Sequence, residues 1–291
     1  MLWTPGNVRR EPVRPRLQRN ALNVGLVACL PLNEGLGSTR DLASGNVGTL
    51  TVSNGWPAWD ATGGIKFHRA AFSVGFVTFG NRPAYQVTGP LTMSVGVYRT
   101  GIVYVGQNAG IVTKNVGDTG NNRSYQVLVG DAFEVKFSIS SDGTAVTQKT
   151  AVTGNGLITS NTLHRIVARF IPSTSMDIFV DGVLKVSDTT SVPAGIFNGT
   201  APLRLGMTYT ATGSHVLGWE GYMDMPYIWS RALSDSEILR HSAYPYEGLV
   251  NPHWGAVSAP AGVTQVRYGT DLLSSGIGGH QSQMLGGLLA A

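Results

Sequence analysis

The feature that most constrains this fold is a succession of short alternating segments separated by turn residues. In "HRIVARFI" (164–171) and "SMDIFV" (175–180), apolar side chains fall on every second position, which is the period of a β-strand. Similar segments recur with Gly, Asn, Asp or Ser between them. Only 13% of residues are charged and 38 are glycine, a composition that favours short strands over long helices. The pattern predicts an all-β sandwich and not a parallel α/β sheet.

Two carboxylates in "MDIFVDGVLK" (176–185) raise the question of chemistry. Asp181-Gly182 lies between alternating segments, and a type I′ hairpin turn requires positive φ at both central residues. We therefore assign Asp181 to backbone geometry and not to catalysis. Asp177 falls on the polar face of the preceding strand, where we expect it to be solvated and unpaired.

One helix is predicted, in "LSDSEILRHSAY" (233–244). Ser234 and Glu237 have the spacing of a capping box, and Leu233 and Ile238 have the spacing of a hydrophobic staple across it.

Composition divides the chain into three regions. Residues 1–20 form a basic Pro- and Arg-rich arm, residues 21–246 carry the strand patterns, and residues 247–291 form a Gly-rich tail. The net charge of +4 belongs to the arm, since the remainder is near neutral. The basic residues of the arm, which we expect to bind partners, are Arg9, Arg10, Arg14, Arg16 and Arg19.

Three blocks, in order, resemble laminin-G-like domains of the concanavalin A-like lectin and glucanase group. They are "GLVACLPLNEGLGSTRDLASGNVGTL" (25–50), "LHRIVARFIPSTSMDIFVDGVLK" (163–185) and "LRLGMTYTATGSHVLGWEGYMDMPYIWSRALSDSEI" (203–238). The resemblance implies a jelly-roll β-sandwich with one short C-terminal helix, here flanked by extended arms. The leader "MLWTPG" and the segment "AYPYEGLVNP" (243–252) also resemble such domains encoded by tailed phages.

Calcium is the one ion that the resemblance brings into question. Family members that bind calcium or sugar do so with carboxylates and amides on edge loops, and Asp224 matches that pattern. However, Phe67-His68-Arg69 replaces an acidic motif, and Met225 replaces a glutamate. Asp118 and Asn121 add oxygen donors, although turn chemistry explains them without a metal. We expect no cofactor, with calcium as the alternative.

Four aromatic residues lie in or near predicted loops and are candidates for stacking on sugar rings, although packing explains them equally well. They are Trp219, Tyr222, Tyr209 and Trp56.

No catalytic pattern is recognisable in the sequence. Glu220 and Asp224 do not match the ExDxxE strand of the laminarinase-type glycosidases that share this fold. The six histidines have no zinc-ligand spacing, and there is no phosphate-binding loop. Lone Cys29 lies in an apolar segment, where we expect it to be buried and unreactive. We therefore expect a protein that is not an enzyme.

The leading expectation is a structural protein of a phage particle, such as a capsid decoration or fibre component, with the sandwich displayed outward. Its partners would be other copies and other particle proteins, bound through the arms. The alternative is a lectin-like adhesion module that binds surface glycans. No apolar segment approaches the roughly 20 residues that span a bilayer, and no signal peptide is recognisable, so we expect synthesis in the host cytoplasm and location in the virion. The arm lacks interleaved aromatics, so nucleic acid is not expected to bind.

Overall fold

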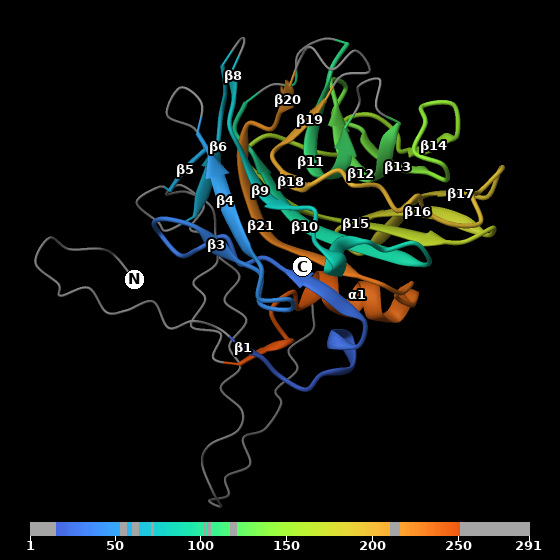
Figure 1. Ribbon diagram of the computed structural model, residues 1–291, viewed down its shortest axis with the longest axis horizontal. Coiled ribbons are helices and arrows are strands. Elements are labelled where there is room, and N and C mark those ends of the chain that lie inside the picture. Colours follow the sequence, from blue (N-terminus) through green and yellow to red (C-terminus); the bar gives the residue numbers. More distant parts are fainter. Residues whose placement is uncertain are drawn as a thin grey trace, which may run out of the picture.

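The computed structural model describes residues 16–52, 57–59, 64–70, 73–101, 103, 106–116, 121–209 and 216–250. Across these residues, two eight-stranded sheets pack face to face (Figure 1). All strand pairs within the sheets are antiparallel, as expected where short turns join neighbouring strands. The prediction of an all-β sandwich is confirmed.

The first sheet has the order β17-β16-β15-β10-β21-β6-β5, with β2 also paired to β21. Its strands are β2 (Leu26–Cys29), β5 (Ala58–Trp59), β6 (Ile65–Phe67), β10 (Leu91–Arg99), β15 (Leu163–Ile171), β16 (Ser175–Val180), β17 (Val183–Asp188) and β21 (Gly221–Trp229).

The second sheet has the order β14-β13-β12-β11-β18-β9-β4-β3. Its strands are β3 (Thr39–Arg40), β4 (Val47–Thr51), β9 (Phe76–Gly80), β11 (Asn108–Val116), β12 (Asn122–Gly130), β13 (Val135–Ser140), β14 (Gln148–Val152) and β18 (Leu203–Leu205). Smaller elements are the ribbons β1 (Arg16–Leu17) with β22 (Leu249–Val250), β7 (Arg69–Ala70) with β8 (Ser73–Val74), and β19 (Met207–Tyr209) with β20 (Val216–Gly218). The helices are η1 (Ala21–Asn23), η2 (Pro83–Tyr85) and α1 (Asp235–Ala243).

The main core fills the space between the sheets. Alternate residues of each strand enter it, among them Val95 and Val97 of β10 facing Val127 and Phe137 of the second sheet, all essentially without exposure. Burying a side chain of this size stabilises the fold by roughly 1.5–3 kcal/mol.

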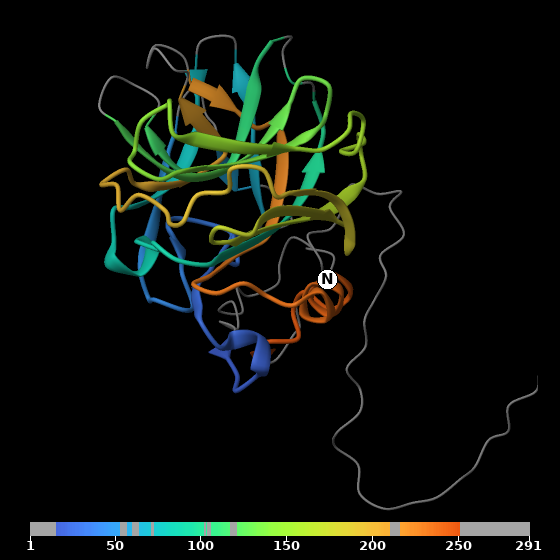
Figure 2. The same ribbon diagram turned by 90° about the vertical axis from the view of Figure 1, so that its right-hand side faces the viewer.

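A second core lies on the outer face of the first sheet, beneath α1 (Figure 2). Ile238 of the helix packs there with Trp229 and Tyr227, whose rings stack with centroids 5.4 Å apart. Cys29 is fully buried in the same cluster, as predicted. The predicted capping box is also confirmed, because the Glu237 N–H donates to Ser234 Oγ and the Ser234 N–H donates to Glu237 Oε2.

The Asp-Gly turn joins β16 to β17 as predicted, with φ of 54° at Asp181 and 79° at Gly182. The expectation that Asp177 is solvated and unpaired is wrong. Asp177 is 2% exposed, lies 2.8 Å from an Arg169 nitrogen, and accepts a hydrogen bond from Ser187 Oγ. The outer face of this strand is covered by the residues around α1, which the alternation pattern alone does not reveal.

The two ends of the described chain are joined. β1 pairs with β22, the Gln18 N–H donates to the Gly248 carbonyl, and Trp229 Nε1 donates to the Leu22 carbonyl. Residues 16–20 and 247–250, assigned by composition to the arm and the tail, therefore make regular hydrogen bonds with the sandwich or with each other. Among the described residues, no helix is long and apolar enough to cross a membrane.

Candidate binding site on the outer face of the second sheet

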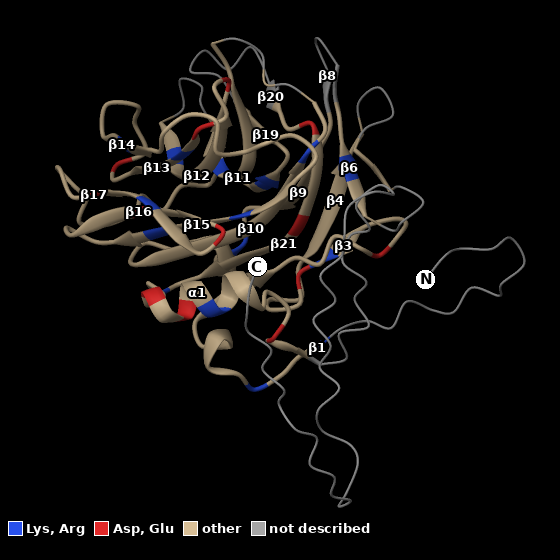
Figure 3. Cartoon of the chain, turned by 180° about the vertical axis from the view of Figure 1, so that it is seen from behind, with Lys and Arg blue, Asp and Glu red and all other residues tan. Residues whose placement is uncertain are grey.

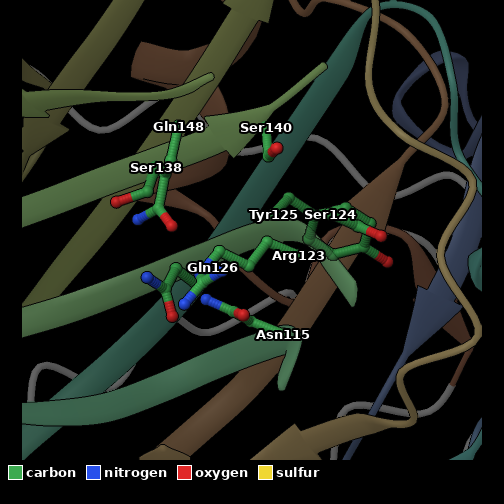
Figure 4. A pocket seen from close by; sticks show the side chains of 8 residues that line it. All are labelled: Asn115, Arg123, Ser124, Tyr125, Gln126, Ser138, Ser140 and Gln148. Carbon is green, nitrogen blue, oxygen red and sulfur yellow. The ribbon is translucent and has the colours of Figure 1, made fainter. Parts of the chain in front are cut away.

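A small polar pocket lies on the face of the second sheet that points away from the main core (Figure 4). It holds about 120 Å³ of space, part of it open to solvent. The lining residues that the structure describes carry amides, hydroxyls and one guanidinium but no carboxylate. The lining residues are Asn115, Arg123, Ser124, Tyr125, Gln126, Ser138, Ser140 and Gln148.

Strand alternation explains most of this lining. Tyr125 and Val127 of β12 point into the main core, so Gln126 between them points outward. On the neighbouring strand β13, Phe137 and Ile139 are in the core and Ser138 faces the pocket.

A β-bulge brings Arg123 to the same face. Lys114 pairs with Tyr125, but the next residue, Asn115, pairs with Arg123, so Ser124 is the extra residue on β12. Without the bulge, Arg123 would point with Tyr125 into the core. With it, Arg123 and Asn115 are cross-strand partners and both line the pocket.

The Asn115 side chain is 5% exposed, and its Oδ1 atom is buried without a hydrogen-bond partner. An unsatisfied buried acceptor costs roughly 1–3 kcal/mol, and such atoms are rare in folded proteins. Figure 4 shows the Asn115 amide among the Arg123 and Gln126 side chains. A bound hydroxyl or amine would satisfy the orphaned oxygen.

Neighbouring elements hold the pocket side chains in place. Thr208 Oγ1 of β19 donates to Gln126 Oε1 at 3.0 Å, and the hydroxyls of Ser138 and Thr150 lie 2.9 Å apart. β19 can lie against β11 because Gly110 has no side chain: a Cβ there would lie 2.0 Å from the Met207 carbonyl carbon. The polar groups are therefore largely positioned before any ligand binds.

Lys114, one residue before Asn115, is buried on the opposite face. Its Nζ donates to the carbonyls of Gly199 and Ala201 and to Asn81 Oδ1, at 2.6, 2.7 and 3.1 Å. Burial lowers the pKa of Lys114 to about 8. None of these three hydrogen-bond partners carries a negative charge.

The predicted aromatic platform is not assembled by the described residues. Trp219 is 1% exposed in the main core, and its Nε1 donates to the Tyr222 carbonyl. Its prediction as a surface ring is wrong, since the segment before β21 turns the indole inward. Tyr222 is half-buried, with its ring 6.2 Å from that of Tyr98. Trp56 and the Tyr209 side chain lie outside the described residues.

Asp224, the predicted calcium ligand, is 5% exposed and forms a salt bridge with Arg165. Tyr246 Oη donates to the same carboxylate at 2.8 Å. Asn121 is exposed with φ of 45°, and Asp118 lies outside the described residues. Within the described part of the chain, no three His, Cys, Asp or Glu side chains form a group that could hold a metal. The calcium prediction is untested. Asp224 itself is committed to an internal ion pair.

Two further groups of predicted residues lie away from the pocket. Glu220 is 3.2 Å from His68 Nδ1, whereas Asp224 contacts Arg165 and Tyr246. In the arm, Arg16 and Arg19 are exposed, and Arg9, Arg10 and Arg14 lie outside the described residues.

Comparison with known families identifies this architecture. A sequence profile of the concanavalin A-like lectin/glucanases superfamily matches residues 74–239, more than half of the chain. The chain belongs to this superfamily. The comparison with curated protein sequences gave no match.

Solved structures with the superfamily fold include the binding domain of botulinum neurotoxin DC in complex with rat synaptotagmin II, at a TM-score of 0.58 and 10% identity over 77% of this chain and 52% of that one. The binding domain of Paraclostridial Mosquitocidal Protein 1 has a TM-score of 0.53 and 13% identity, over 78% of this chain and 53% of that one. Trypanosoma rangeli sialidase in complex with sialic acid has a TM-score of 0.54 and 11% identity, over 75% of this chain and 33% of that one. The chain thus spans about half the length of the first two, and the likeness concerns the fold.

Proposed function

We propose that this protein is a carbohydrate-binding module without enzymatic activity, which binds glycans at the pocket on β11–β14. The observation that carries the proposal is a preformed set of amides, hydroxyls and a guanidinium around an orphaned buried oxygen, Asn115 Oδ1. Sugar hydroxyls both donate and accept, and Asn and Gln amides offer both functions to them. One structure with this fold is described as a complex with sialic acid, which supports the choice of ligand class. Two others are described as binding domains, one of them in complex with rat synaptotagmin II.

The size of the pocket sets the mode of binding. Its described lining residues are buried except for half-buried Gln148, so the pocket does not enclose a whole sugar ring. It therefore receives one edge or substituent of a sugar while the rest of the glycan lies along the sheet. Single contacts of this kind are weak, and several linked copies raise the avidity.

A glycan array tests the proposal. The full chain should give saturable binding to defined glycans, and Gln148→Ala should weaken it, because that half-buried amide lines the pocket. Gln86→Ala is the matched control, a half-buried glutamine that does not line the pocket. Equal binding by both variants would place the glycan elsewhere, and absence of any glycan binding would refute the proposal.

A second candidate, a component of a phage particle surface, is favoured by the pairing of β1 with β22. This ribbon lies at the opposite end of the molecule from β19 and β20 (Figure 1), and it pairs Arg16 with Val250, the two ends of the described chain. Both terminal regions could then contact one partner while the pocket stays accessible. Sedimentation velocity of the full chain beside residues 16–250 tests it: assembly by the full chain alone supports anchoring, and two monomers would contradict it.

A further inference from the structure

We propose that the pocket is specific for acidic sugars, with Arg123 binding a carboxylate and Asn115 accepting a hydrogen bond from a hydroxyl beside it. This inference rests on the glycan-binding function proposed above and names the class of its ligand. On this inference, the pocket binds uronic and sialic acids more tightly than neutral sugars.

The charges around the pocket favour an anion. Among the eight lining residues that the structure describes, Arg123 is the charged one, and none is Asp or Glu. Lys114, next to Asn115 on β11, has carbonyl and amide oxygens as its hydrogen-bond partners. Both positive charges are nearly excluded from solvent, with exposures of 7% for Arg123 and 1% for Lys114. Salt screens buried charges less than surface charges, so their combined potential acts on a ligand at the pocket.

The arrangement of Arg123 and Asn115 matches a hydroxy acid. The two residues are cross-strand partners that line the same pocket, so one small ligand can reach both. A guanidinium presents five N–H donors in a planar fork and binds carboxylates in a bidentate manner. The orphaned Asn115 Oδ1 requires a donor, which a carboxylate cannot supply but a neighbouring hydroxyl can. Uronic and sialic acids carry both groups.

Arg123 already makes a contact in this structure. Its five donors allow a carboxylate to be added to that contact or to exchange with it.

Isothermal titration of the full chain with matched oligosaccharides tests the inference. The pairs are glucuronyl and glucosyl, galacturonyl and galactosyl, and sialyllactose and lactose. Since hydrogen bonds to charged groups are the strong ones, the acidic member of at least one pair should bind about tenfold tighter or more. Equal or tighter binding of the neutral members overturns the inference but leaves glycan binding intact. Failure of every sugar to bind refutes both.

Variants and a salt series locate the effect. Arg123→Gln should weaken binding of the acidic member more than binding of the neutral member and so remove the preference, and Arg40→Gln, at an exposed arginine of β3, should retain the preference. Because Arg123 is nearly buried, its substitution can also disturb the fold. A salt series on the wild-type protein therefore provides a second measurement. Burial reduces screening of the Arg123 charge but does not abolish it, so raising salt from about 50 to about 500 mM should weaken binding of the acidic member more than binding of the neutral one. Equal weakening contradicts the inference.

A sulfated neutral oligosaccharide separates carboxylate recognition from general anion binding. Weaker binding of the sulfated sugar than of the uronic acid supports the carboxylate assignment. Equal binding of the two overturns it.

Discussion

At the scale of single residues, Arg169 shows how burial decides the contribution of an ion pair. Its guanidinium contacts two carboxylates: Asp177 Oδ2 at 2.8 Å and Asp235 Oδ1 at 2.6 Å. The first side chain is 2% exposed and the second 73%. Water screens the exposed pair, so that pair contributes little to stability. Removal of one partner from the buried pair leaves the other charge buried without compensation, which costs more.

We expect Asp177→Asn to destabilise the fold by about 3 kcal/mol, because it leaves the Arg169 charge buried without its main partner. Asp235→Asn should cost about 1 kcal/mol or less, including its favourable position at the start of α1. Urea unfolding of the two variants provides the comparison. Similar losses of stability in both would show that the buried pair has no special role.

The residue scale is also where sequence-based prediction succeeded least. The positive φ values at Asp181 and Gly182 were predictable because a two-residue hairpin turn is a local structure. The pairing of Asp177 was not, because the alternation in β16 cannot show that α1 covers its outer face. Arg123 and Asn115 meet only because of a bulge in β12, which is a feature of strand pairing and not of either segment alone.

At the scale of elements, the N-terminus of α1 is fixed by the capping box of Ser234 and Glu237. Its capping box is supported by Arg231, whose guanidinium contacts both oxygens of Glu237. Figure 3 shows acidic residues at the beginning of the helix and a basic residue nearer its end, which complements the helix dipole. The hydrogen bonds from Arg231 lower the pKa of Glu237 from 4.5 to about 2 against the opposing effect of burial.

This shift predicts a pH dependence of stability. Glu237 is ionised more readily in the folded chain, so its contribution is complete above pH 4.5 and is lost as the pH falls toward 2. Glu237→Gln should therefore be less stable than wild type at neutral pH by about 1 kcal/mol, with solvent screening included. The two proteins should converge in acid. Chemical unfolding at a series of pH values measures this, and a constant difference down to pH 2 would rule out the ionised capping box as its source.

The helix and most of the main strands were predictable from the sequence, because a capping box and period-two alternation can each be recognised within a few consecutive residues. The predicted strand "SMDIFV", for example, coincides with β16. Gln126 and Ser138 could have been noted as polar residues between core positions of β12 and β13. Their meeting with Asn115 and Gln148 depends on the order of four strands in one sheet, which the sequence does not state.

At the scale of the whole molecule, the chain closes on itself. η1 packs Leu22 against the end of the sandwich, and the Leu22 carbonyl accepts the hydrogen bond of the buried Trp229 indole. β1 and β22 then join the two ends of the described chain. The described part of the chain is therefore closed by pairing of its own two ends.

We predict that residues 16–250 unfold at the same urea concentration as the full chain. Removal of residues 16–25 as well should cost about 3 kcal/mol or more, since it uncovers Trp229, leaves its Nε1 unpaired and removes the burial of Leu22. Equal stability of the two shortened chains would mean that residues 16–25 do not stabilise the fold.

The most direct test of the central claim, that the pocket on β11–β14 binds glycans, is a ¹H–¹⁵N NMR titration that follows side-chain amide resonances. A glucuronic-acid-terminated disaccharide and its glucose-terminated counterpart serve as probes. We predict shifts of the Asn115, Gln126 and Gln148 amides with at least one probe, while the Gln86 amide stays in place. Unchanged resonances of all three pocket amides, or shifts confined to residues outside the pocket, would contradict the account.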